Sequence, residues 1–210
     1  MNKIKMFDQP VVFIVDDEET IREALSSLFR SVGLHTRTFG STKEFLQCSL
    51  PDVPACLVLD VRLPGMSGLD FQIELSSMGI HLPIIFISGH ADVPMSVKAM
   101  KRGAVEFLTK PIRDQDLLDA VRLAIERDQG ERQKNQLNSD LRTRFDSLTS
   151  REKEVLALVA TGLMNKQIAG KMDIREVTVK VHRGNVMRKM GARSLAALVR
   201  MADSVIQAKG

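Results

Sequence analysis

Cysteine and the larger aromatic residues are scarce in this sequence. Its 210 residues include two cysteines, no tryptophan and no tyrosine. The cysteines, Cys48 and Cys56, flank a proline-containing loop, and no histidine cluster lies near them. This spacing fits neither a disulfide framework nor a zinc site, so we expect both residues to be buried or unused thiols.

Long apolar runs are also missing. No stretch reaches the roughly 20 apolar residues that a membrane-spanning helix needs. Met1–Lys5 is not followed by a long apolar segment, so we expect no secretory signal. The composition, 44% hydrophobic and 27% charged, is typical of chains that form packed cores. We therefore expect a cytoplasmic protein that has no membrane partner.

The charge is distributed unevenly along the chain. Residues 1–128 hold 14 Lys and Arg against 18 Asp and Glu (net −4), residues 129–147 hold 4 against 3 (+1), and residues 148–210 hold 12 against 5 (+7). A basic last third is typical of a region that binds a polyanion such as nucleic acid. A basic face exposed only to water would have the same composition, so charge alone leaves both possibilities open.

Up to Ile125 the sequence alternates short apolar runs with amphipathic stretches, which predicts alternating strands and helices. The unbroken Val, Ile and Leu runs suit strands buried on both faces of a parallel sheet. Five such units in a row predict an α/β fold with right-handed crossovers. The predicted strands are Val11–Val15, Thr36–Phe39, Cys56–Leu59, Pro83–Ile87 and Glu106–Leu108, and the predicted helices are Glu19–Val32, Thr42–Gln47, Leu69–Ser77, Val93–Arg102 and Asp114–Arg127.

A polar segment follows the last of these helices. Its apolar residues, spaced four, four and three apart as on one helical stripe, are Leu137, Leu141, Phe145 and Leu148. We predict a partly helical linker over residues 129–147; a disordered linker is the alternative. From Leu148 onward only helical patterns remain. Thr149–Glu152 is a capping box, Gly162 can end the first helix, and Asn165 can cap the next.

Polar side chains follow the predicted strands at the points where the strands end. Asp16 and Asp17 follow the first strand, Asp60 the third, Ser88 the fourth and Lys110 the fifth. In an open parallel sheet, ligands bind beyond the carboxyl ends of the strands. We therefore expect three carboxylates, a hydroxyl and an ammonium group to meet at one edge of the sheet.

This set of groups predicts phosphoryl chemistry. Clustered carboxylates need a compensating cation, and hard oxygen ligands favour Mg²⁺. With Mg²⁺ bound, a phosphoryl group can approach Asp60, whose carboxylate acts as the nucleophile, while Lys110 and Ser88 contact the phosphoryl oxygens. Acidic residues also favour helix N-termini, which explains Glu18 and Glu19. That explanation does not account for Asp60, which follows an apolar strand.

Four segments around these residues resemble the receiver domains of two-component response regulators. They are Val15–Asp17, Leu59–Gly68, Ile87–His90 and Leu108–Pro111, and the resemblance covers residues 10–128. It implies a doubly wound, flavodoxin-like sheet of order 2-1-3-4-5 and a cis Lys110–Pro111 bond. It also implies Asp60 as the phosphoacceptor of a sensor histidine kinase. The ligands that it implies for one Mg²⁺ ion are Asp16, Asp17, Asp60 and the backbone carbonyl of Arg62.

The same resemblance implies a switch. Phosphorylation would draw Ser88 toward the phosphoryl group, and Phe107 would turn into the space that it leaves. Many receivers have Thr and Tyr at these two positions. Phe107 can equally be a plain core residue. The helix over Val93–Arg102 would be remodelled and would favour a homodimer.

Residues 148–205 resemble the LuxR-type helix-turn-helix, through Leu148–Glu152, Asn165–Ala169 and Val177–His182. We predict a scaffold helix over Lys166–Lys171 and a recognition helix over Arg175–Met190. At about 100° per residue, one face of the recognition helix packs on the bundle and the opposite face is exposed. The packed face holds Val179, Val186 and Met190, and the exposed face holds Val177, Val181, Gly184 and Arg188.

The exposed face of the recognition helix predicts contacts to double-stranded DNA. Thymine methyl groups in the major groove would cover its two valines. The candidate contacts are Lys166, Val177, Thr178, Lys180, Val181, Arg183 and Arg188, the arginines and Lys166 being better placed for phosphates. Gly184 allows a close approach to the DNA or marks a missing base contact. The last helix, Ser194–Gln207, either pairs two subunits or packs in the core.

We therefore predict a transcriptional response regulator of the FixJ/NarL type. Its parts are a receiver at 8–128, a linker at 129–147 and a DNA-binding domain at 148–210. Phosphorylation of Asp60 would promote dimerisation, promoter binding and contact with RNA polymerase, without enzymatic turnover.

Two alternatives belong to other classes. A Mg²⁺-dependent phosphatase with an aspartyl nucleophile would carry a second Asp two residues after Asp16, where Glu18 stands. A DNA-binding protein with a receiver that is never phosphorylated would not need the complete set of site residues.

Overall fold

The computed structural model describes residues 9–90 and 92–207. Residues 1–8, on which the prediction about a secretory signal falls, lie outside the described residues, as do 91 and 208–210. The chain divides into two compact units between residues 132 and 133, within the predicted linker. No helix in the described part is both long and apolar enough to cross a membrane.

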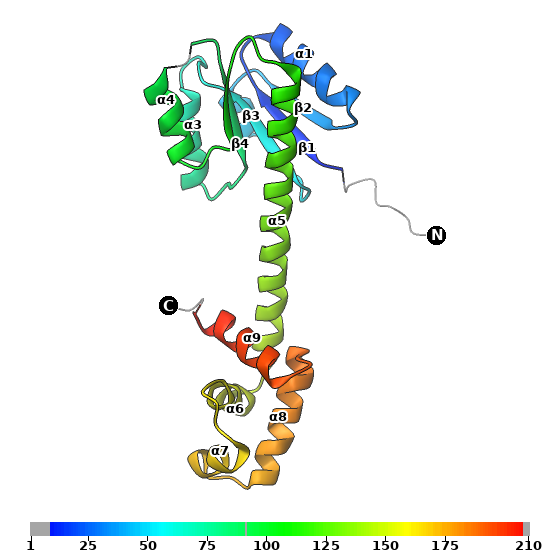
Figure 1. Cartoon of the computed structure of the whole chain (residues 1–210), viewed down its shortest axis with the longest axis vertical. Coiled ribbons are helices and arrows are strands. Elements are labelled where there is room, and N and C mark those ends of the chain that lie inside the picture. The colour runs from blue at the N-terminus through cyan, green and yellow to red at the C-terminus, as the bar shows by residue number, and fades with distance from the viewer. Residues whose placement is uncertain (1–8, 91, 208–210) are drawn as a thin grey trace, which may run out of the picture. The chain divides into compact units, whose positions relative to one another are not determined.

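The first unit is built on a parallel five-stranded sheet (Figure 1). The strand order β2-β1-β3-β4-β5 confirms the predicted α/β fold and its 2-1-3-4-5 topology. Each predicted strand is present, with ends that differ by one residue at most. The strands are β1 (Val11–Val15), β2 (His35–Phe39), β3 (Ala55–Asp60), β4 (Ile84–Ser88) and β5 (Glu106–Thr109).

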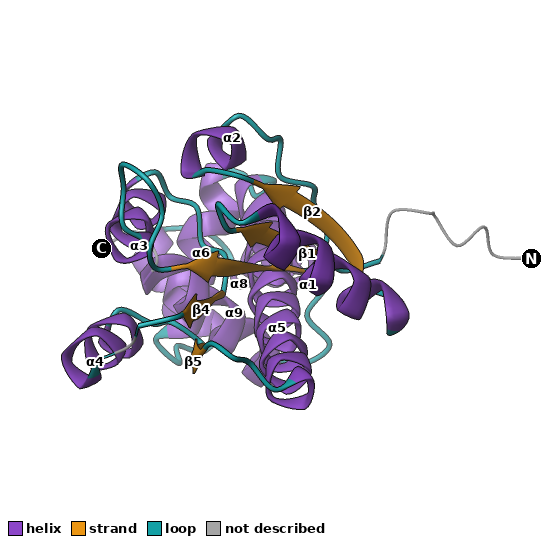
Figure 2. Cartoon of the chain, turned by 90° about the horizontal axis from the view of Figure 1, so that it is seen from above, coloured by secondary structure: helices purple, strands orange, loops and turns teal. Residues whose placement is uncertain are grey.

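The helices of the first unit cover both faces of the sheet. They are α1 (Glu19–Ser31), α2 (Thr42–Leu46), α3 (Gly68–Ser77), α4 (Val93–Lys101) and α5 (Asp114–Asp146). Helices α1 and α5 lie on one side, and α2, α3 and α4 on the other (Figure 2). The side chains of Ser41, Ser67 and Asp92 cap α2, α3 and α4 by accepting a backbone N–H in the first turn.

Alternate strand residues supply the two cores, because successive side chains of a strand point to opposite faces. Phe13 and Leu57 face α2 and α3, whereas Ile14 and Val58 face α1 and α5. Phenylalanine supplies all of the core aromatics: the rings of Phe13 and Phe45 meet edge to face at 5.5 Å. Cys56 is buried and Cys48 half-buried, and both are free thiols, as predicted. Burial raises the pKa of the Cys56 thiol to about 12, which keeps it protonated and unreactive.

Helix α5 is longer than the sequence indicates. The prediction ended it at Arg127 and left a partly helical linker, but the helix continues to Asp146, which rules out the disordered alternative. Pairs four residues apart support the extension: Arg132 with Asp128 (2.6 Å), Gln136 with Asp140 (2.8 Å) and Arg142 with Asp146 (3.4 Å). At a few tenths of a kcal/mol each, they offset much of the roughly 1 kcal/mol by which Gly130 disfavours a helix.

Buried Asp128 ties α5 to the sheet. Its Oδ2 accepts the backbone N–H of Ala55, the first residue of β3, at 2.9 Å, and also accepts Nε of Arg132. Arg132 in turn reaches Asp52 at 2.8 Å. This contact was not predicted from the sequence, because a single Asp in a polar helix gives no sign of burial.

The second unit is helical. Its helices after α5 are α6 (Ser150–Ala160), α7 (Asn165–Met172), α8 (Glu176–Met190) and α9 (Leu195–Gln207). The capping box is confirmed, since Thr149 Oγ1 accepts Glu152 N–H at 3.3 Å and Glu152 Oε2 accepts Thr149 N–H at 2.8 Å. The prediction that Asn165 caps α7 is wrong. Met164 holds the cap position, and Gln167 accepts its N–H at 2.9 Å.

The apolar stripe of the linker is confirmed in part. Leu141 and Phe145, at the end of α5, pack on the core of the second unit, and Leu148 is buried in that core. Leu137, one turn earlier, is exposed. The last turns of α5 therefore belong to the fold of the second unit.

Candidate functional site

The ends of β1, β3, β4 and β5 bring the predicted acidic site together. The strands are in register, with Val15 opposite Leu59 and Asp60 opposite Ile87. Asp16 and Lys110 follow β1 and β5 directly, while Asp60 and Ser88 are the last residues of β3 and β4. Neighbouring parallel strands that end at the same level place these residues at one edge, as predicted.

Lys110 lies between two buried carboxylates. Its Nζ is 2.8 Å from Asp16 Oδ2, 3.0 Å from Asp60 Oδ1 and 3.8 Å from Glu18 Oε1. Asp16 is fully buried and Asp60 nearly so. The Lys110–Pro111 bond is cis, as the resemblance implies. The lysine is thus the direct counter-charge of the phosphoacceptor candidate.

Backbone amides fix the second oxygen of each carboxylate. Asp16 Oδ1 accepts the N–H of Glu18 at 2.9 Å, and Asp60 Oδ2 accepts the N–H of Arg62 at 2.7 Å. Each carboxylate is therefore held at both oxygens, one by an amide two residues along the chain and one by Lys110. This arrangement fixes the direction of Asp60 before any ligand binds.

Charge and burial act in opposite directions on these groups. Burial raises the pKa of the Asp16 carboxyl, and the hydrogen bond from Lys110 only partly opposes that effect; the nearby charge of Asp60 adds to the rise. Burial disfavours the ammonium form of Lys110. The hydrogen bonds to Asp16 and Asp60 outweigh this effect and raise the pKa of Lys110. The lysine is consequently charged at neutral pH.

In the described part of the chain, Ser88 forms no hydrogen bond with Asp60, and Phe107 packs against another ring. The buried Ser88 Oγ donates to the carbonyl of His90 at 2.9 Å and accepts its N–H at 3.3 Å. Phe107 is half-buried, and its ring lies 6.0 Å from that of Phe86. In this structure Phe107 packs at the edge of the core, which agrees with the plain core alternative.

The residues fit Mg²⁺ in chemical type and charge. Asp16, Asp17, Glu18 and Asp60 can carry four negative charges, against the positive charges of Lys110 and Arg22, and their oxygens are hard ligands. The ligands are not preassembled. Within residues 9–90 and 92–207, no group of three or more His, Cys, Asp and Glu side chains is placed to hold a metal. Asp16 and Asp60 are paired with Lys110, and Asp17 is exposed.

Two residues that support the site were missed by sequence analysis. Gly68 begins α3 against the backbone of Asp60, and a Cβ at this position would lie 2.4 Å from the Asp60 carbonyl oxygen. Arg22 of α1 reaches back to the acidic loop, where it donates hydrogen bonds to the backbone of Asp16 and Asp17. The sequence shows Gly68 only as part of a motif and Arg22 only as a helical charge.

The two faces of α8 are as predicted. Val179, Val186 and Met190 are buried, whereas Val177 and Val181 are each 59% exposed. Asp173, with φ of 52°, ends α7 in the left-handed conformation and makes the turn toward α8. Two large apolar side chains in water on one helix face favour a surface that a partner covers.

The polar candidates on this surface differ in their exposure and in their hydrogen bonds. Lys166, Lys180 and Arg188 are exposed, and Thr178 is half-buried. Arg183 Nη1 donates to Asn165 Oδ1 at 2.8 Å, which ties α8 to the start of α7. In α9, Leu198 and Ala202 are fully buried while Leu195 is 44% exposed. Core packing therefore accounts for part of the α9 stripe.

Both units match known protein families. Residues 12–122 match the response regulator receiver domain, and residues 146–202 match the bacterial regulatory proteins of the luxR family. The chain belongs to the response regulator family, in the class that joins a receiver to a LuxR-type helix-turn-helix DNA-binding domain. Its homologues are transcriptional response regulators.

Several of these relatives cover almost the whole chain. Nodulation protein W of Bradyrhizobium diazoefficiens is 56% identical over 195 residues, which are 93% of this chain and 86% of the relative. The response regulator protein TmoT of Ectopseudomonas mendocina is 48% identical over 93% of this chain and 89% of its own. The solved structure of the response regulator StyR is 48% identical, with a TM-score of 0.85 over 93% of this chain and 98% of its own.

Proposed function

We propose that Asp60 accepts a phosphoryl group from a sensor histidine kinase and that this modification controls promoter binding by the second unit. The observation that carries the proposal is the setting of Asp60. Its carboxylate is buried at the end of an apolar strand, one oxygen lies 3.0 Å from Lys110, and the other accepts an amide N–H. A carboxylate held in a fixed direction at the carboxyl end of a parallel strand, where such sheets bind ligands, can act as a nucleophile.

The transfer uses the groups around Asp60 in defined roles. A carboxylate oxygen of Asp60 forms a bond to phosphorus as the bond from phosphorus to the donor breaks, and the product is an acyl phosphate. Lys110 holds a phosphoryl oxygen by a charge-assisted hydrogen bond. Receiver domains typically bind Mg²⁺ in their acidic pocket, and this ion would supply charge neutralisation for the transfer. Its proposed ligands are Asp16, Asp17, Asp60 and the Arg62 carbonyl.

The switch would start from Ser88. Its hydroxyl donates to the His90 carbonyl, and we propose that this bond is exchanged for one to a phosphoryl oxygen. Phe107 would then turn into the space that Ser88 leaves. The remodelled face of α4 would promote homodimerisation. This sequence of events links one added charge to a packing change at the surface.

The output is proposed to be promoter recognition. We propose a receiver at 8–128, a linker at 129–147 and a DNA-binding domain at 148–210. Val177 and Val181 would cover thymine methyl groups in the major groove, since both are exposed on α8. Lys180 and Thr178 would contact bases or phosphates, and phosphate contacts would come from Lys166, Arg188 and the remaining N–H groups of Arg183. We propose that the protein acts in the cytoplasm and, when bound to promoter DNA, contacts RNA polymerase.

The proposal is tested by incubating the full chain with acetyl phosphate and Mg²⁺. We expect each chain to retain one phosphoryl group, which acid releases, and we expect the Asp60→Asn variant to acquire none. Asp70→Asn, at an exposed position in the first turn of α3, is the matched control and should be labelled as the wild type is. Continuous release of inorganic phosphate without a stable label would indicate the phosphatase alternative. A chain that is never labelled would indicate the unphosphorylated scaffold.

A further inference from the structure

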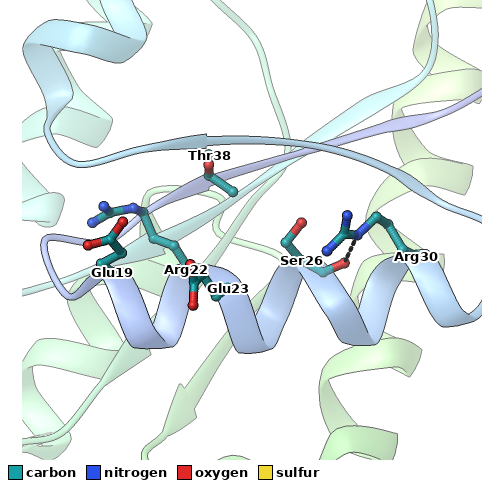
Figure 3. A pocket seen from close by; sticks show the side chains of 6 residues that line it. All are labelled: Glu19, Arg22, Glu23, Ser26, Arg30 and Thr38. Atoms are coloured by element: carbon teal, nitrogen blue, oxygen red, sulfur yellow. Dashed lines mark hydrogen bonds between the residues drawn. The ribbon is translucent and has the colours of Figure 1, made fainter.

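One cationic side chain beside the acidic site has no part in the function proposed above. Arg22 lies on α1, and its Nη1 donates hydrogen bonds to the backbone carbonyl oxygens of Asp16 at 2.8 Å and of Asp17 at 2.9 Å. This nitrogen carries two N–H groups, so it can serve both carbonyls at once. In Figure 3 the guanidinium of Arg22 lies toward the Glu19 end of α1.

The two aspartates depend on Arg22 to different degrees. Asp16 is also held by the backbone carbonyl of Phe39, by the amide of Glu18 and by Lys110. Among the described residues, Asp17 has a single hydrogen bond, which its backbone carbonyl accepts from Arg22. The direction of the Asp17 side chain follows from the orientation of its own backbone. Arg22 is therefore a direct contact to the Asp17 backbone that helps to set this orientation.

We infer that Arg22 is a positioning residue for the Mg²⁺ site. It holds the Asp16–Asp17 backbone in the orientation from which the Asp17 carboxylate can reach the ion. A guanidinium has no acceptor atom and cannot itself bind a metal. The inference rests on the proposed function, because it requires Mg²⁺ to bind at Asp16, Asp17 and Asp60.

Charge and positioning predict opposite effects when Arg22 is replaced. Removing a positive charge near the site favours a divalent cation, so a purely electrostatic role predicts tighter Mg²⁺ binding in a neutral variant. Removing the two hydrogen bonds frees the loop and predicts weaker binding. Loss of groups that orient metal ligands typically lowers metal affinity by about 10–100-fold. The sign of the change therefore separates the two roles.

The experiment is isothermal titration of the full chain with Mg²⁺. The test variants are Arg22→Met, which removes charge and donors, and Arg22→Gln, whose amide is too short to reach both carbonyls. Arg30→Met is the matched control, because Arg30 lies on the same helix and, among the described residues, its side chain donates within α1, from Nε to the Ser26 carbonyl at 3.3 Å (Figure 3). We expect the Kd for Mg²⁺ to rise by about 10-fold in both Arg22 variants and to stay unchanged in Arg30→Met.

A kinetic measurement separates positioning from general damage. In phosphorylation by acetyl phosphate, the Arg22 variants should need more Mg²⁺ for half-maximal rate but should approach the wild-type rate at saturating Mg²⁺. A folded Arg22 variant that binds Mg²⁺ as tightly as the wild type, or whose rate stays low at saturating Mg²⁺, overturns the inference and leaves the proposed function intact. A wild-type chain that binds no Mg²⁺ overturns the proposed function as well. If the Met variant fails to fold by circular dichroism, the Gln variant decides.

Discussion

The substitution Gly68→Ala tests how closely the start of α3 packs against the backbone of Asp60. The added methyl carbon would lie 2.4 Å from the carbonyl oxygen of Asp60 and 3.2 Å from Cγ of Leu59. The first neighbour is backbone, so no side-chain rotation can relieve the contact. Overpacking of this kind costs about 1–3 kcal/mol, and the better helix propensity of Ala returns at most about 1 kcal/mol. The net loss in the free energy of unfolding then lies between about 0 and 3 kcal/mol, and we expect about 1–2 kcal/mol, the middle of that range.

The same substitution should impair phosphorylation by more than the stability loss explains. Asp60 is held by contacts of 3.0 and 2.7 Å, so a shift of its backbone disturbs both. A displacement of about 1 Å at a reacting group can slow a reaction roughly 100-fold. We expect Gly68→Ala to take up phosphoryl groups from acetyl phosphate at least about 10-fold more slowly under conditions where it is fully folded.

Gly130→Ala is the control, because the same chemical change there meets open space within α5. It should stabilise the protein by up to about 1 kcal/mol and leave phosphorylation unchanged. Urea unfolding followed by circular dichroism measures both variants, since a chain without Trp or Tyr has no useful intrinsic fluorescence. Equal stability of Gly68→Ala and the wild type, with unchanged phosphorylation, would refute the packing argument.

Three further predictions concern the second unit. The hydrogen bond from Lys189 lowers the pKa of Glu152. The ion pair therefore stabilises the unit above the ordinary pKa of the carboxyl, and this stabilisation is lost as the pH falls through the lowered pKa. Glu152→Gln should lower the free energy of unfolding by about 1–2 kcal/mol at pH 7 and show a flatter acid-unfolding curve by circular dichroism. Lys180→Ala should weaken promoter binding and reduce the slope of log K against log salt by about 1, and an unchanged slope in fluorescence anisotropy with labelled DNA would place Lys180 away from phosphates. Leu198→Ala should lower the free energy of unfolding in urea by about 2–5 kcal/mol. Leu195→Ala, at a 44% exposed position, should change it by less than about 0.5 kcal/mol. Similar losses in the two variants would contradict the burial pattern of α9.

The sheet could be predicted from sequence because its inner strands are unbroken apolar runs. Val11–Val15 and the run that ends at Asp60 are buried along their full length, and burial on both faces leaves a clear signal. The edge strand β2 (His35–Phe39) is mostly polar, so its pattern is weak. The full length of α5 was missed because each pair that supports it contributes only a few tenths of a kcal/mol, and no single pair marks the helix in the sequence.

The candidate site was predictable in its residues but not in its contacts. Asp16, Asp60 and Lys110 follow strands, and parallel topology alone brings them to one edge. The sharing of Lys110 by two carboxylates depends on side-chain directions that only the folded chain fixes. The hydrogen bonds from Ser88 to the His90 carbonyl and from Arg22 to the Asp16 carbonyl also depend on side-chain directions. Local spacing gives no signal for such contacts.

The most direct test of the central proposal is to locate the phosphoryl group in the wild-type chain. After reaction with acetyl phosphate and Mg²⁺, borohydride converts the acyl phosphate to a stable homoserine, which mass spectrometry of the digested protein can assign to a residue. We predict homoserine at Asp60 and at no other aspartate. An unmodified Asp60 together with a modified Asp16 or Asp17, or a chain without any modification, would contradict the assignment of Asp60 as the phosphoacceptor.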